Sequence, residues 1–357
     1  MPTEPKISVV VATFKRAPIL ARTLDHIVKQ QYDPAAFEVI VVDDGSEDGT
    51  DAVVHAAAAS APVAIHYLSH ENRGPGYTQN RGIRAARGEI VLLLADDIFL
   101  TPGALEAHIR RHDSHPDPRV AVLGNAVQSP ELDGTGFLRR WDAFGMNRFD
   151  HLEELPYFLF WAFNLSFKRE FMLSHGMFRE ALGRGGPPAH EDTELGYRLH
   201  RRGMVLLFAK EALGYHYHPS TLRQAARRYY ERGLNYGELI TLAPDPLLTV
   251  FFHVLTPGSL GSYRRALRAC SWCSGRERSF AWHVFRHAMR GLVFNRLTVQ
   301  IIWRPLLTRG DHADALARAI PARLYGPYLF YHFLAGIDDA RHRFSLSDRH
   351  SLIRTPE

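Results

Sequence analysis

The stretch GEIVLLLADDIFLT, residues 88–101, decides the fold. Its apolar run from Ile90 to Leu94, bounded by a glycine and by acids, is typical of a strand buried on both faces. Asp96 and Asp97 follow at the carboxyl end, where two carboxylates are costly unless they bind a positive partner. Ligands of open α/β sheets bind at this edge. For an isolated Asp-Asp, a helix cap or a solvated turn is the alternative.

Three further apolar runs precede this strand, and helical patterns separate them. The expected strands are residues 6–13, 37–42 and 63–68, and the expected helices are 18–31, 51–59 and 77–86. This alternation predicts an α/β fold with a mostly parallel sheet and helices on both faces. Right-handed crossovers bring the carboxyl end of every strand, and the polar residues that follow it, to one edge.

Two common nucleotide-binding signatures are missing from this α/β pattern. A dinucleotide-binding Rossmann domain needs G-x-G-x-x-G after the first strand, but the sequence there is Thr13-Phe14-Lys15-Arg16, and no glycine follows until Gly45. A P-loop, G-x-x-x-x-G-K-[ST], is also absent.

Composition is that of an ordinary globular protein with a basic excess. The 357 residues carry a net charge of +5, which favours an anionic partner such as a nucleotide, a phospholipid or a nucleic acid. Cys270 and Cys273 lack a second cysteine pair, so a zinc site is not expected and a reducing cytosol is the default compartment. No apolar segment follows a basic one at the start, so we expect no signal peptide.

The strand-end segments carry a resemblance to a known family. VVVATFKR (9–16), VVDDGSEDGT (41–50), NRGPGYTQNRGIRAARG (72–88) and LLLADD (92–97) resemble, in order and spacing, the successive blocks of family 2 glycosyltransferases. FNLS (163–166) and GRGGPPAHEDTELGYRLHRRG (183–203) continue it. Members of that family are inverting enzymes of the GT-A fold. The resemblance covers roughly the first 230 residues and fades after them.

The resemblance implies roles for the acids at the end of the central strand. Departure of a nucleoside diphosphate is helped by a divalent cation, and Mn²⁺ or Mg²⁺ prefers hard oxygen ligands. Asp97 is expected to bind the metal and Asp96 to lie on the ribose side. The family motif is usually written D-x-D, and Ala95 stands here in place of its first acid.

The nucleobase is expected at the other strand ends. The resemblance assigns base contacts to Thr13 and Asp44, and an acid can accept the N3–H of uracil or thymine but finds no such donor on cytosine. Arg73 is a candidate for a diphosphate or base contact. The alternative for residues 43–50 is a helix cap with an Asx-turn, and two neighbouring acids allow both uses.

The acceptor side is expected around Glu191-Asp192. Inversion needs a general base for the acceptor hydroxyl, and the resemblance places it at Asp192, with Glu191 beside the donor or acceptor. The alternative is a pair of acids at a helix start. The glycine-rich residues 183–188 could act as a hinge. Asn164 is expected to touch the donor sugar or the acceptor, and its alternative is a buried amide with satisfied hydrogen bonds.

Two alternating histidines complete the expected site. His216 and His218 lie where relatives often present a histidine to the metal or the diphosphate, and an extended chain puts both on one face. Because the chain has 20 histidines, an inert role is the alternative for either one.

The last third of the chain is predicted to be helical and basic. Between Arg264 and Arg309 there are ten arginines and the single acid Glu277, with tryptophans and phenylalanines among them. This pattern favours amphipathic helices on an anionic membrane, or a packed helical subdomain with a basic outer face. RNA binding is a weaker option, because no RNA-binding motif accompanies the charge.

We therefore expect a GT-A catalytic domain over residues 1–235 and a helical basic extension over 236–357. The expected function is transfer of a sugar from a UDP- or dTDP-sugar to a hydroxyl of a glycan or lipid-linked glycan, with Mn²⁺ or Mg²⁺ and no nucleic acid. The expected location is the cytoplasm or, for a peripheral protein, the inner face of the membrane. The alternative is a protein of the same fold that binds a nucleotide sugar without turnover.

Overall fold

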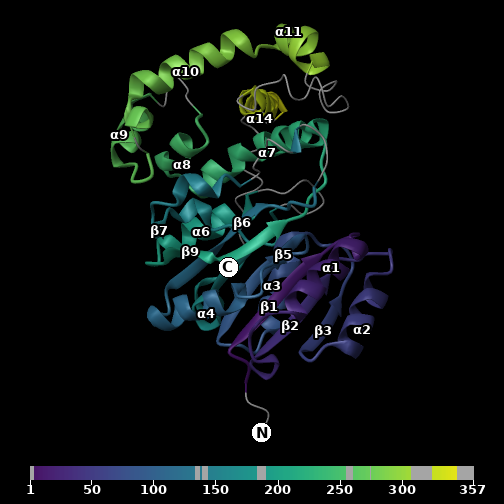
Figure 1. Ribbon diagram of the computed structural model, residues 1–357. Helices are drawn as coiled ribbons and strands as arrows, with labels where there is room; N and C mark the ends of the chain where they lie inside the picture. The colour runs from purple at the N-terminus through teal and green to yellow at the C-terminus, as the bar shows by residue number, and fades with distance from the viewer. Residues whose placement is uncertain are drawn as a thin grey trace. The chain divides into compact units, whose positions relative to one another are not determined.

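The computed structural model describes residues 4–132, 137–138, 144–182, 190–254, 260–273, 275–306 and 324–343. These residues form two compact units (Figure 1). The first holds the described chain up to Leu132 and most of that between residues 142 and 218; the second holds the chain from Pro219 onward, with Phe137, Leu138 and His190. The boundary expected at residue 235 lies inside one continuous helix of the second unit, α7.

A nine-stranded mixed sheet, in the order β3-β2-β1-β4-β8-β6-β9-β5 with β7 paired to β9, organises the first unit. Its strands are β1 (Ile7–Thr13), β2 (Phe37–Asp43), β3 (Ala64–Ser69), β4 (Ile90–Ala95), β5 (Ile98–Leu100), β6 (Val120–Gln128), β7 (Glu154–Leu155), β8 (Asn164–Lys168) and β9 (Val205–His216). The first four expected strands are parallel neighbours, as predicted. Every residue of β2 is buried, which explains its unbroken apolar run.

Helices flank this sheet (Figure 1). They are α1 (Ala17–Val28), α2 (Thr50–Ser60), α3 (Pro75–Ala85), α4 (Ala104–Ser114), α5 (Arg169–His175) and α6 (Glu191–His200), with short turns η1 (Pro34–Ala36), η3 (Met146–Phe149) and η4 (Tyr157–Leu159). The predicted alternation of strands and helices over the first hundred residues is therefore confirmed.

The second unit is helical, as predicted. Its elements are α7 (Leu222–Leu242), α8 (Pro246–Phe251), α9 (Leu260–Ala269), η6 (Gly275–Arg278), α10 (Phe280–Val293), α11 (Arg296–Thr298), the π-helical turn η7 (Val299–Trp303) and α14 (Tyr325–Arg343). A capping box formed by Thr221 and Gln224 starts α7. The backbones of helices α7 and α14 lie close together at Gly233. A side chain at this position would overlap the carbonyl of Phe333. Among the described residues, no helix is both long and apolar enough to cross a bilayer.

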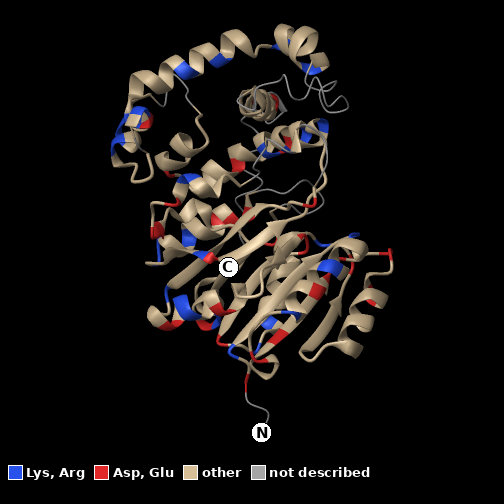
Figure 2. Cartoon of the chain, viewed as in Figure 1, with Lys and Arg blue, Asp and Glu red and all other residues tan. Residues whose placement is uncertain are grey.

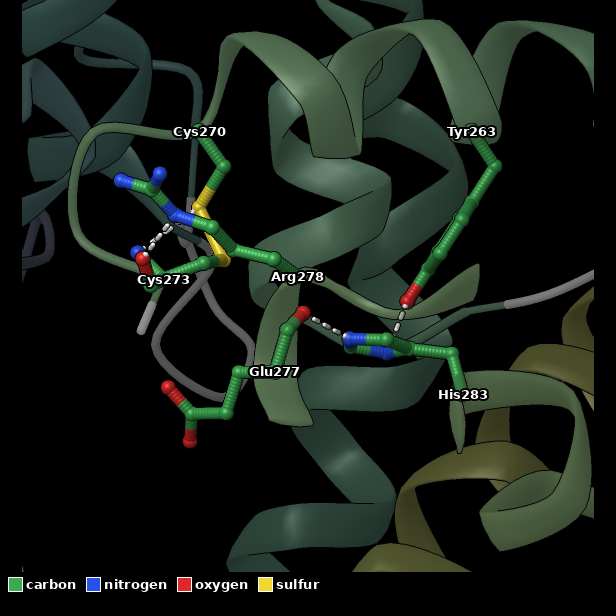
Figure 3. Close-up of a disulfide and its surroundings, with 6 residues drawn as sticks. All are labelled: Tyr263, Cys270, Cys273, Glu277, Arg278 and His283. Carbon is green, nitrogen blue, oxygen red and sulfur yellow. Dashed lines mark hydrogen bonds between the residues drawn. A yellow bond between two sulfur atoms is a disulfide. The ribbon is translucent and has the colours of Figure 1, made fainter. Parts of the chain in front are cut away.

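Cys270 and Cys273 form a disulfide at the end of α9 (Figure 3). Both residues are buried with Tyr263 and Leu267, and the carbonyl of Cys273 accepts a hydrogen bond of 2.8 Å from Arg278 Nε. A disulfide is not what a reducing cytosol favours. The sequence did not predict this bond.

Candidate active site at the carboxyl edge of the sheet

Predicted site residues at the ends of β1, β2, β4 and β9 lie at one edge of the sheet. Thr13 ends β1 and is in register with Asp43, the last residue of β2. Asp96 and Asp97 directly follow β4, the other neighbour of β1. β9 returns to the same place, because the backbone N–H of Tyr217 donates to the carbonyl of Asp97 over 2.8 Å. The topology therefore explains why residues about 200 positions apart in sequence can meet.

The Asp96 carboxylate is buried and holds two side chains from the first loop. Thr13 Oγ1 donates to its Oδ2 over 2.7 Å, and Arg16 Nη1 donates to its Oδ1 over 2.7 Å. Its backbone carbonyl accepts from Thr23 Oγ1 of α1 over 2.6 Å. Burial raises the pKa of Asp96 to about 6, although the charge of Arg16 opposes this rise. Three contacts thus hold Asp96 in place. One of them is with Thr13, which is also predicted to face the nucleotide.

Asp97 is the centre of a cluster of cationic and imidazole groups. Its Oδ2 lies 2.8 Å from Arg16 Nη2, 2.9 Å from His218 Nδ1 and 3.4 Å from His216 Nε2. The two imidazole rings stack with centroids 5.3 Å apart. Burial alone would raise the pKa of Asp97, but hydrogen bonds from His216 and His218 and the charge of Arg16 hold it well below its usual range. Asp97 is therefore an ionised carboxylate.

The geometry of Asp97, His216 and His218 fits a divalent cation. Their ligand atoms all lie within 4.8 Å of one another. Ligands about 2.1 Å from one ion are at most about 4.2 Å apart, so small side-chain rotations would close the triad. One carboxylate and two imidazole nitrogens form a mixed donor set, which suits Mn²⁺ better than Mg²⁺, an ion that prefers oxygen ligands.

Arg16 is the residue that sequence reasoning missed. The two acids appeared to have no basic partner because none is near them in the sequence, yet Arg16, 80 positions before Asp96, bridges both carboxylates. The sequence gave a weak indication of this contact, because a basic residue that follows the first strand must lie at the same edge of the sheet as the acids. Arg16 Nη2 also lies 3.2 Å from His218 Nδ1, so it belongs to the same cluster as the candidate metal ligands.

Asp43, the first acid of the pair after β2, is a structural residue. Its Oδ1 accepts from the backbone N–H of Ser46 over 2.9 Å, as in the Asx-turn considered as the alternative. Its Oδ2 accepts from the Tyr67 hydroxyl over 2.7 Å. Burial and this hydrogen bond raise the pKa of Tyr67, which keeps the phenol protonated and able to donate.

Asp44, predicted to read the base, holds the loop after β3. Its Oδ1 accepts from the backbone N–H of Arg73 over 2.7 Å and lies 3.4 Å from His70 Nδ1. Its Oδ2 accepts from Asn72 Nδ2 and from the backbone N–H of Gly74, each over 3.0 Å. A carboxylate oxygen has about two lone-pair sites, so the two donors fill Oδ2, whereas Oδ1 accepts one hydrogen bond and keeps a site for another donor.

Arg73 meets this carboxylate through its backbone N–H, and its predicted contact with the nucleotide stays a prediction. Its guanidinium stacks over the Tyr77 ring at 4.2 Å from the centroid. The backbone N–H of Asp44 donates to the carbonyl of Thr13 over 2.9 Å. The predicted nucleotide residues are therefore linked through direct contacts to the Asp97 cluster.

The prediction that Asn164 touches a sugar is wrong in this structure. The residue is fully buried, its Nδ2 donates to the carbonyl of Ala212 over 2.8 Å, and its Oδ1 accepts from His108 Nε2 over 3.0 Å. Both ends of the amide thus have protein partners, which is the alternative stated for it. The physical reason is the sheet: Asn164 begins β8, which lies in the interior between β4 and β6.

Asn164 instead joins a buried polar network under the sheet. The Ser166 hydroxyl lies 2.8 Å from His108 Nδ1 and 2.9 Å from His112 Nε2. Because the Asn164 oxygen accepts from His108 Nε2, the neutral His108 ring accepts at Nδ1 from Ser166, and His112 then donates to Ser166. Burial lowers the pKa of His108 to about 4 and that of His112 to about 3.

Glu191 and Asp192 occupy the first turn of α6, as predicted from the sequence. Both side chains are half-buried, and Asp192 Oδ1 accepts from the backbone N–H of Thr193 over 2.7 Å. The helix start favours an ionised carboxylate, which is the form that a base needs. Both acids belong to the same compact unit as the Asp97 cluster. The proposed hinge, residues 183–188, lies outside the described residues, and the base role of Asp192 stays a prediction.

A buried acid not considered in the sequence fixes α6. Glu194 is fully buried, and its carboxylate accepts from Arg179 Nε over 2.9 Å and from Arg198 Nε over 2.7 Å. The segment before Arg179 is bound in turn by Asn80 of α3, which exchanges two hydrogen bonds with the backbone of Phe178. This network ties the helix that carries Asp192 to α3.

Comparisons with known proteins find similar sequences among glycosyltransferases. Residues 8–172 match the profile of the family described as Glycosyl transferase family 2. The chain is 28% identical over 304 residues to validoxylamine A glucosyltransferase of Streptomyces hygroscopicus subsp. limoneus, covering 76% of this chain and 64% of that protein. It is 29% identical over 219 residues to glucosyl-dolichyl phosphate glucuronosyltransferase of Haloferax volcanii, covering 58% and 67%. The chain thus spans about two thirds of the length of these relatives.

A solved structure with the same fold supports the assignment. A mannosyltransferase of Pyrobaculum calidifontis, in complex with GDP-Man and Mn²⁺, aligns with a TM-score of 0.60 and 20% identity over 96% of this chain and 89% of that one. At this identity the likeness concerns the fold alone, and it confirms the predicted GT-A architecture. With the strand-end residues in their expected places, residues 8–172 of the chain resemble glycosyl transferase family 2 in sequence and in fold.

Proposed function

We propose that this protein is a metal-dependent inverting glycosyltransferase. It transfers a hexosyl group from a nucleoside diphosphate sugar to a hydroxyl of a glycan or lipid-linked glycan, in the assembly of a surface polysaccharide or glycolipid. The observation that carries the proposal is the convergence of Asp97, His216 and His218 next to Asp96 and Thr13 at the ligand-binding edge of the sheet.

Asp97, His216 and His218 would hold the divalent cation. When bound, such a cation stabilises the charge that develops on the departing diphosphate. The donor set favours Mn²⁺ over Mg²⁺, and the mannosyltransferase of the same fold was solved in complex with GDP-Man and Mn²⁺. The histidines bind a cation only when neutral at the ligating nitrogen, so binding should weaken in acid.

The nucleotide would lie along Thr13, Asp96, Asp44 and Arg73. We propose a UDP- or dTDP-sugar as donor, because the resemblance assigns Asp44 to the base. A carboxylate can also accept from the N1–H of guanine, and the mannosyltransferase of the same fold binds GDP-Man. Since Asp44 already accepts from the backbone N–H groups of Arg73 and Gly74, base identity is the part of the proposal to test first.

Asp192 would act as the general base in the transfer step. The acceptor oxygen attacks the anomeric carbon as its proton passes to the Asp192 carboxylate, and the bond from that carbon to the diphosphate oxygen breaks with its electron pair leaving on the diphosphate. Attack from the face opposite the leaving group inverts the configuration. The network of Glu194 keeps α6, and with it Asp192, in position.

The decisive experiment compares Asp192→Asn with Glu191→Gln. Asp192→Asn keeps the shape of the side chain and removes its basicity, so turnover should fall by about 10²–10⁴-fold while donor affinity stays nearly unchanged. Glu191→Gln is the matched control and should lower turnover by a smaller factor. Turnover and nucleotide affinity are measured for both variants; near-parental turnover of Asp192→Asn would place the base elsewhere, and a loss of donor affinity would move Asp192 to the nucleotide site.

A panel of nucleotides defines the donor. Thermal unfolding with UDP, dTDP and GDP, each with and without Mn²⁺, reports binding because a ligand of the folded state raises its stability. Ala95, in place of the first acid of the family motif, keeps the alternative of a nucleotide-sugar-binding protein without turnover in consideration. Release of nucleoside diphosphate from any sugar donor in the presence of an acceptor and Mn²⁺ would exclude that alternative.

A further inference from the structure

The second compact unit exposes an unusual amount of apolar surface in one segment. Seven of the ten large apolar residues exposed among the described residues lie between Val284 and Ile302. Six of these define what we call the apolar stripe: Phe285, Met289, Leu292, Leu297, Ile301 and Ile302. Their exposed fractions run from 41% at Met289 to 69% at Leu292. Contiguous apolar exposure of this kind marks an interaction surface.

The stripe follows from the helical geometry of α10. Phe285, Met289 and Leu292 are spaced by four and three residues, so they share one face of the helix. The opposite face carries His283, which is buried, and Arg290, whose guanidinium stacks at 4.6 Å over Phe330. The helix therefore turns a polar face inward and an apolar face outward, which is the reverse of the usual surface helix.

The charge around the stripe is strongly positive. From residue 264 to residue 304 the sequence contains nine arginines and one acid, Glu277. Seven of these arginines are exposed: Arg264, Arg265, Arg268, Arg276, Arg278, Arg296 and Arg304. Figure 2 shows basic residues recurring along α9, α10 and the segment after it, with acidic residues scarce there. An occupant of this surface must therefore offer both apolar and negatively charged groups.

We propose that the apolar stripe and the exposed arginines dock on an anionic phospholipid bilayer. Apolar side chains enter the boundary between headgroups and acyl chains, while arginines bind the lipid phosphates. None of the helices in the described part of the chain is suited to span a bilayer, so the contact is parallel to the surface. The proposal is independent of the donor and acceptor, and it would place the enzyme where lipid-linked acceptors are found.

The test uses the full chain and vesicles of phosphatidylcholine with or without phosphatidylglycerol. Cosedimentation should show binding to the anionic vesicles at low salt, little binding to the neutral ones, and weaker binding as salt rises, because surface charges are screened beyond about 10 Å at 0.1 M. Hydrogen exchange on the same samples should show protection of residues 284–302 by anionic vesicles and unchanged exchange in α7, a readout that needs no variant.

Two sets of variants separate the apolar and the electrostatic contributions. Phe285→Gln, Leu292→Gln and Ile301→Gln together should weaken partition at least about tenfold; Ile240→Gln, at an exposed position of α7, is the control. Arg264→Gln, Arg265→Gln and Arg268→Gln together should weaken it by about a hundredfold; Arg201→Gln with Arg202→Gln, exposed arginines of the first unit, is the control for charge. Unchanged thermal unfolding verifies that each variant folds.

Three outcomes would overturn the proposal. The first is no binding of the parent protein to anionic vesicles at low salt. The second is equal binding to neutral and anionic vesicles, which would remove the role of the arginines. The third is self-association in solution that the stripe variants abolish while vesicle binding persists, because the stripe would then be an interface between two copies of the chain.

Discussion

Two pairs of adjacent acids lie at the same edge of the sheet, and their partners are of different kinds. Asp43 and Asp44 accept from backbone N–H groups, an amide and a phenol of their own unit. Asp96 and Asp97 instead face a guanidinium, and Asp97 also faces two imidazoles. The first pair is satisfied by neutral donors, whereas the second is compensated by cationic or metal-binding groups. A ligand cation can replace a guanidinium or bind an imidazole beside a carboxylate. It cannot replace the neutral donors that hold Asp43 and Asp44.

Two pairs of histidines differ in the same way: one pair meets a neutral hydroxyl and the other a carboxylate. His108 and His112 are one helical turn apart on α4 and are buried around the Ser166 hydroxyl. His216 and His218 are two residues apart at the end of β9 and face Asp97. Spacing alone puts each pair on one face of its element. What separates the structural pair from the candidate ligands is the charge of the group that they meet.

The largest expected effect tests the two acid pairs directly. Asp97→Asn removes the carboxylate that would bind the cation, and such a cation supplies several kcal/mol to the transition state, so turnover should fall by about a thousandfold. Stabilisation of the protein by Mn²⁺ with nucleotide should disappear as well. The measurements are turnover and thermal unfolding with and without Mn²⁺.

Asp44→Asn is the matched variant from the other pair. It turns one acceptor oxygen into an NH2 donor that must face the backbone N–H of either Arg73 or Gly74, so the free energy of unfolding should fall by about 1–3 kcal/mol. Stabilisation by Mn²⁺ alone should persist. If Asp44→Asn lost the response to Mn²⁺ as fully as Asp97→Asn does, the distinction between the pairs would be wrong.

The sequence predicted where the strands and the polar residues lie much better than it predicted which groups the polar residues contact. The apolar runs and the alternation with helices located β1, β2, β3 and β4 within one or two residues, because buried parallel strands have a distinctive composition. Strand direction then predicted which polar residues share an edge. The resemblance supplied Asp97, His216 and His218 as a group, and the structure brings their ligand atoms within 4.8 Å.

Several side-chain partners were not predicted, because they depend on tertiary structure. Asn164 has the same sequence signature whether its amide faces a substrate or the core, and only the sheet order shows that β8 is internal. The hydrogen bonds of Asp44 depend on the path of the loop after β3. Arg16 meets acids that are 80 and 81 positions away in the sequence. The Cys270–Cys273 bond depends on the compartment as well as on geometry.

An intermediate effect is expected from the buried histidine pair. Burial lowers the pKa of His108 to about 4 and of His112 to about 3, whereas an unfolded histidine has a pKa near about 6.5. The unfolded chain therefore binds protons that the folded chain excludes. This stability is complete above about pH 6.5 and is lost as the pH falls toward the folded values, by about 2 kcal/mol per histidine at pH 5.

His112→Gln tests this pair because glutamine can still donate to Ser166 but does not titrate. The free energy of unfolding, measured by urea, should fall by about 2 kcal/mol less between pH 7 and pH 5 than it does in the parent protein. Glu89 lies close enough to influence His112, and hydrogen bonds from Lys168 and Lys6 lower its pKa to about 2, so its carboxylate stays charged over this range. His55→Gln, at an exposed position of α2, is the control. An unchanged slope in His112→Gln would mean that the ring is already charged in the folded protein.

The smallest expected effect concerns Arg16, which would compete with the cation for Asp97. Arg16 Nη2 lies 2.8 Å from the same Oδ2 that both histidines face, so a cation held by that oxygen must displace the guanidinium. Arg16→Gln removes the competing charge and leaves two buried carboxylates without their guanidinium partner, a situation that favours any cation that can reach them.

Binding of Mn²⁺ in the absence of nucleotide should therefore become tighter in Arg16→Gln, by about tenfold or about 1.4 kcal/mol. Lys15→Gln, which removes the same charge from the neighbouring exposed side chain, should leave the affinity nearly unchanged. Titration calorimetry of both variants measures the difference. Weaker Mn²⁺ binding in Arg16→Gln would show that the guanidinium supports the metal-binding arrangement of Asp97, His216 and His218 rather than competing with the ion. Arg16 would then belong with the partners that hold the site in shape, as the donors around Asp44 do.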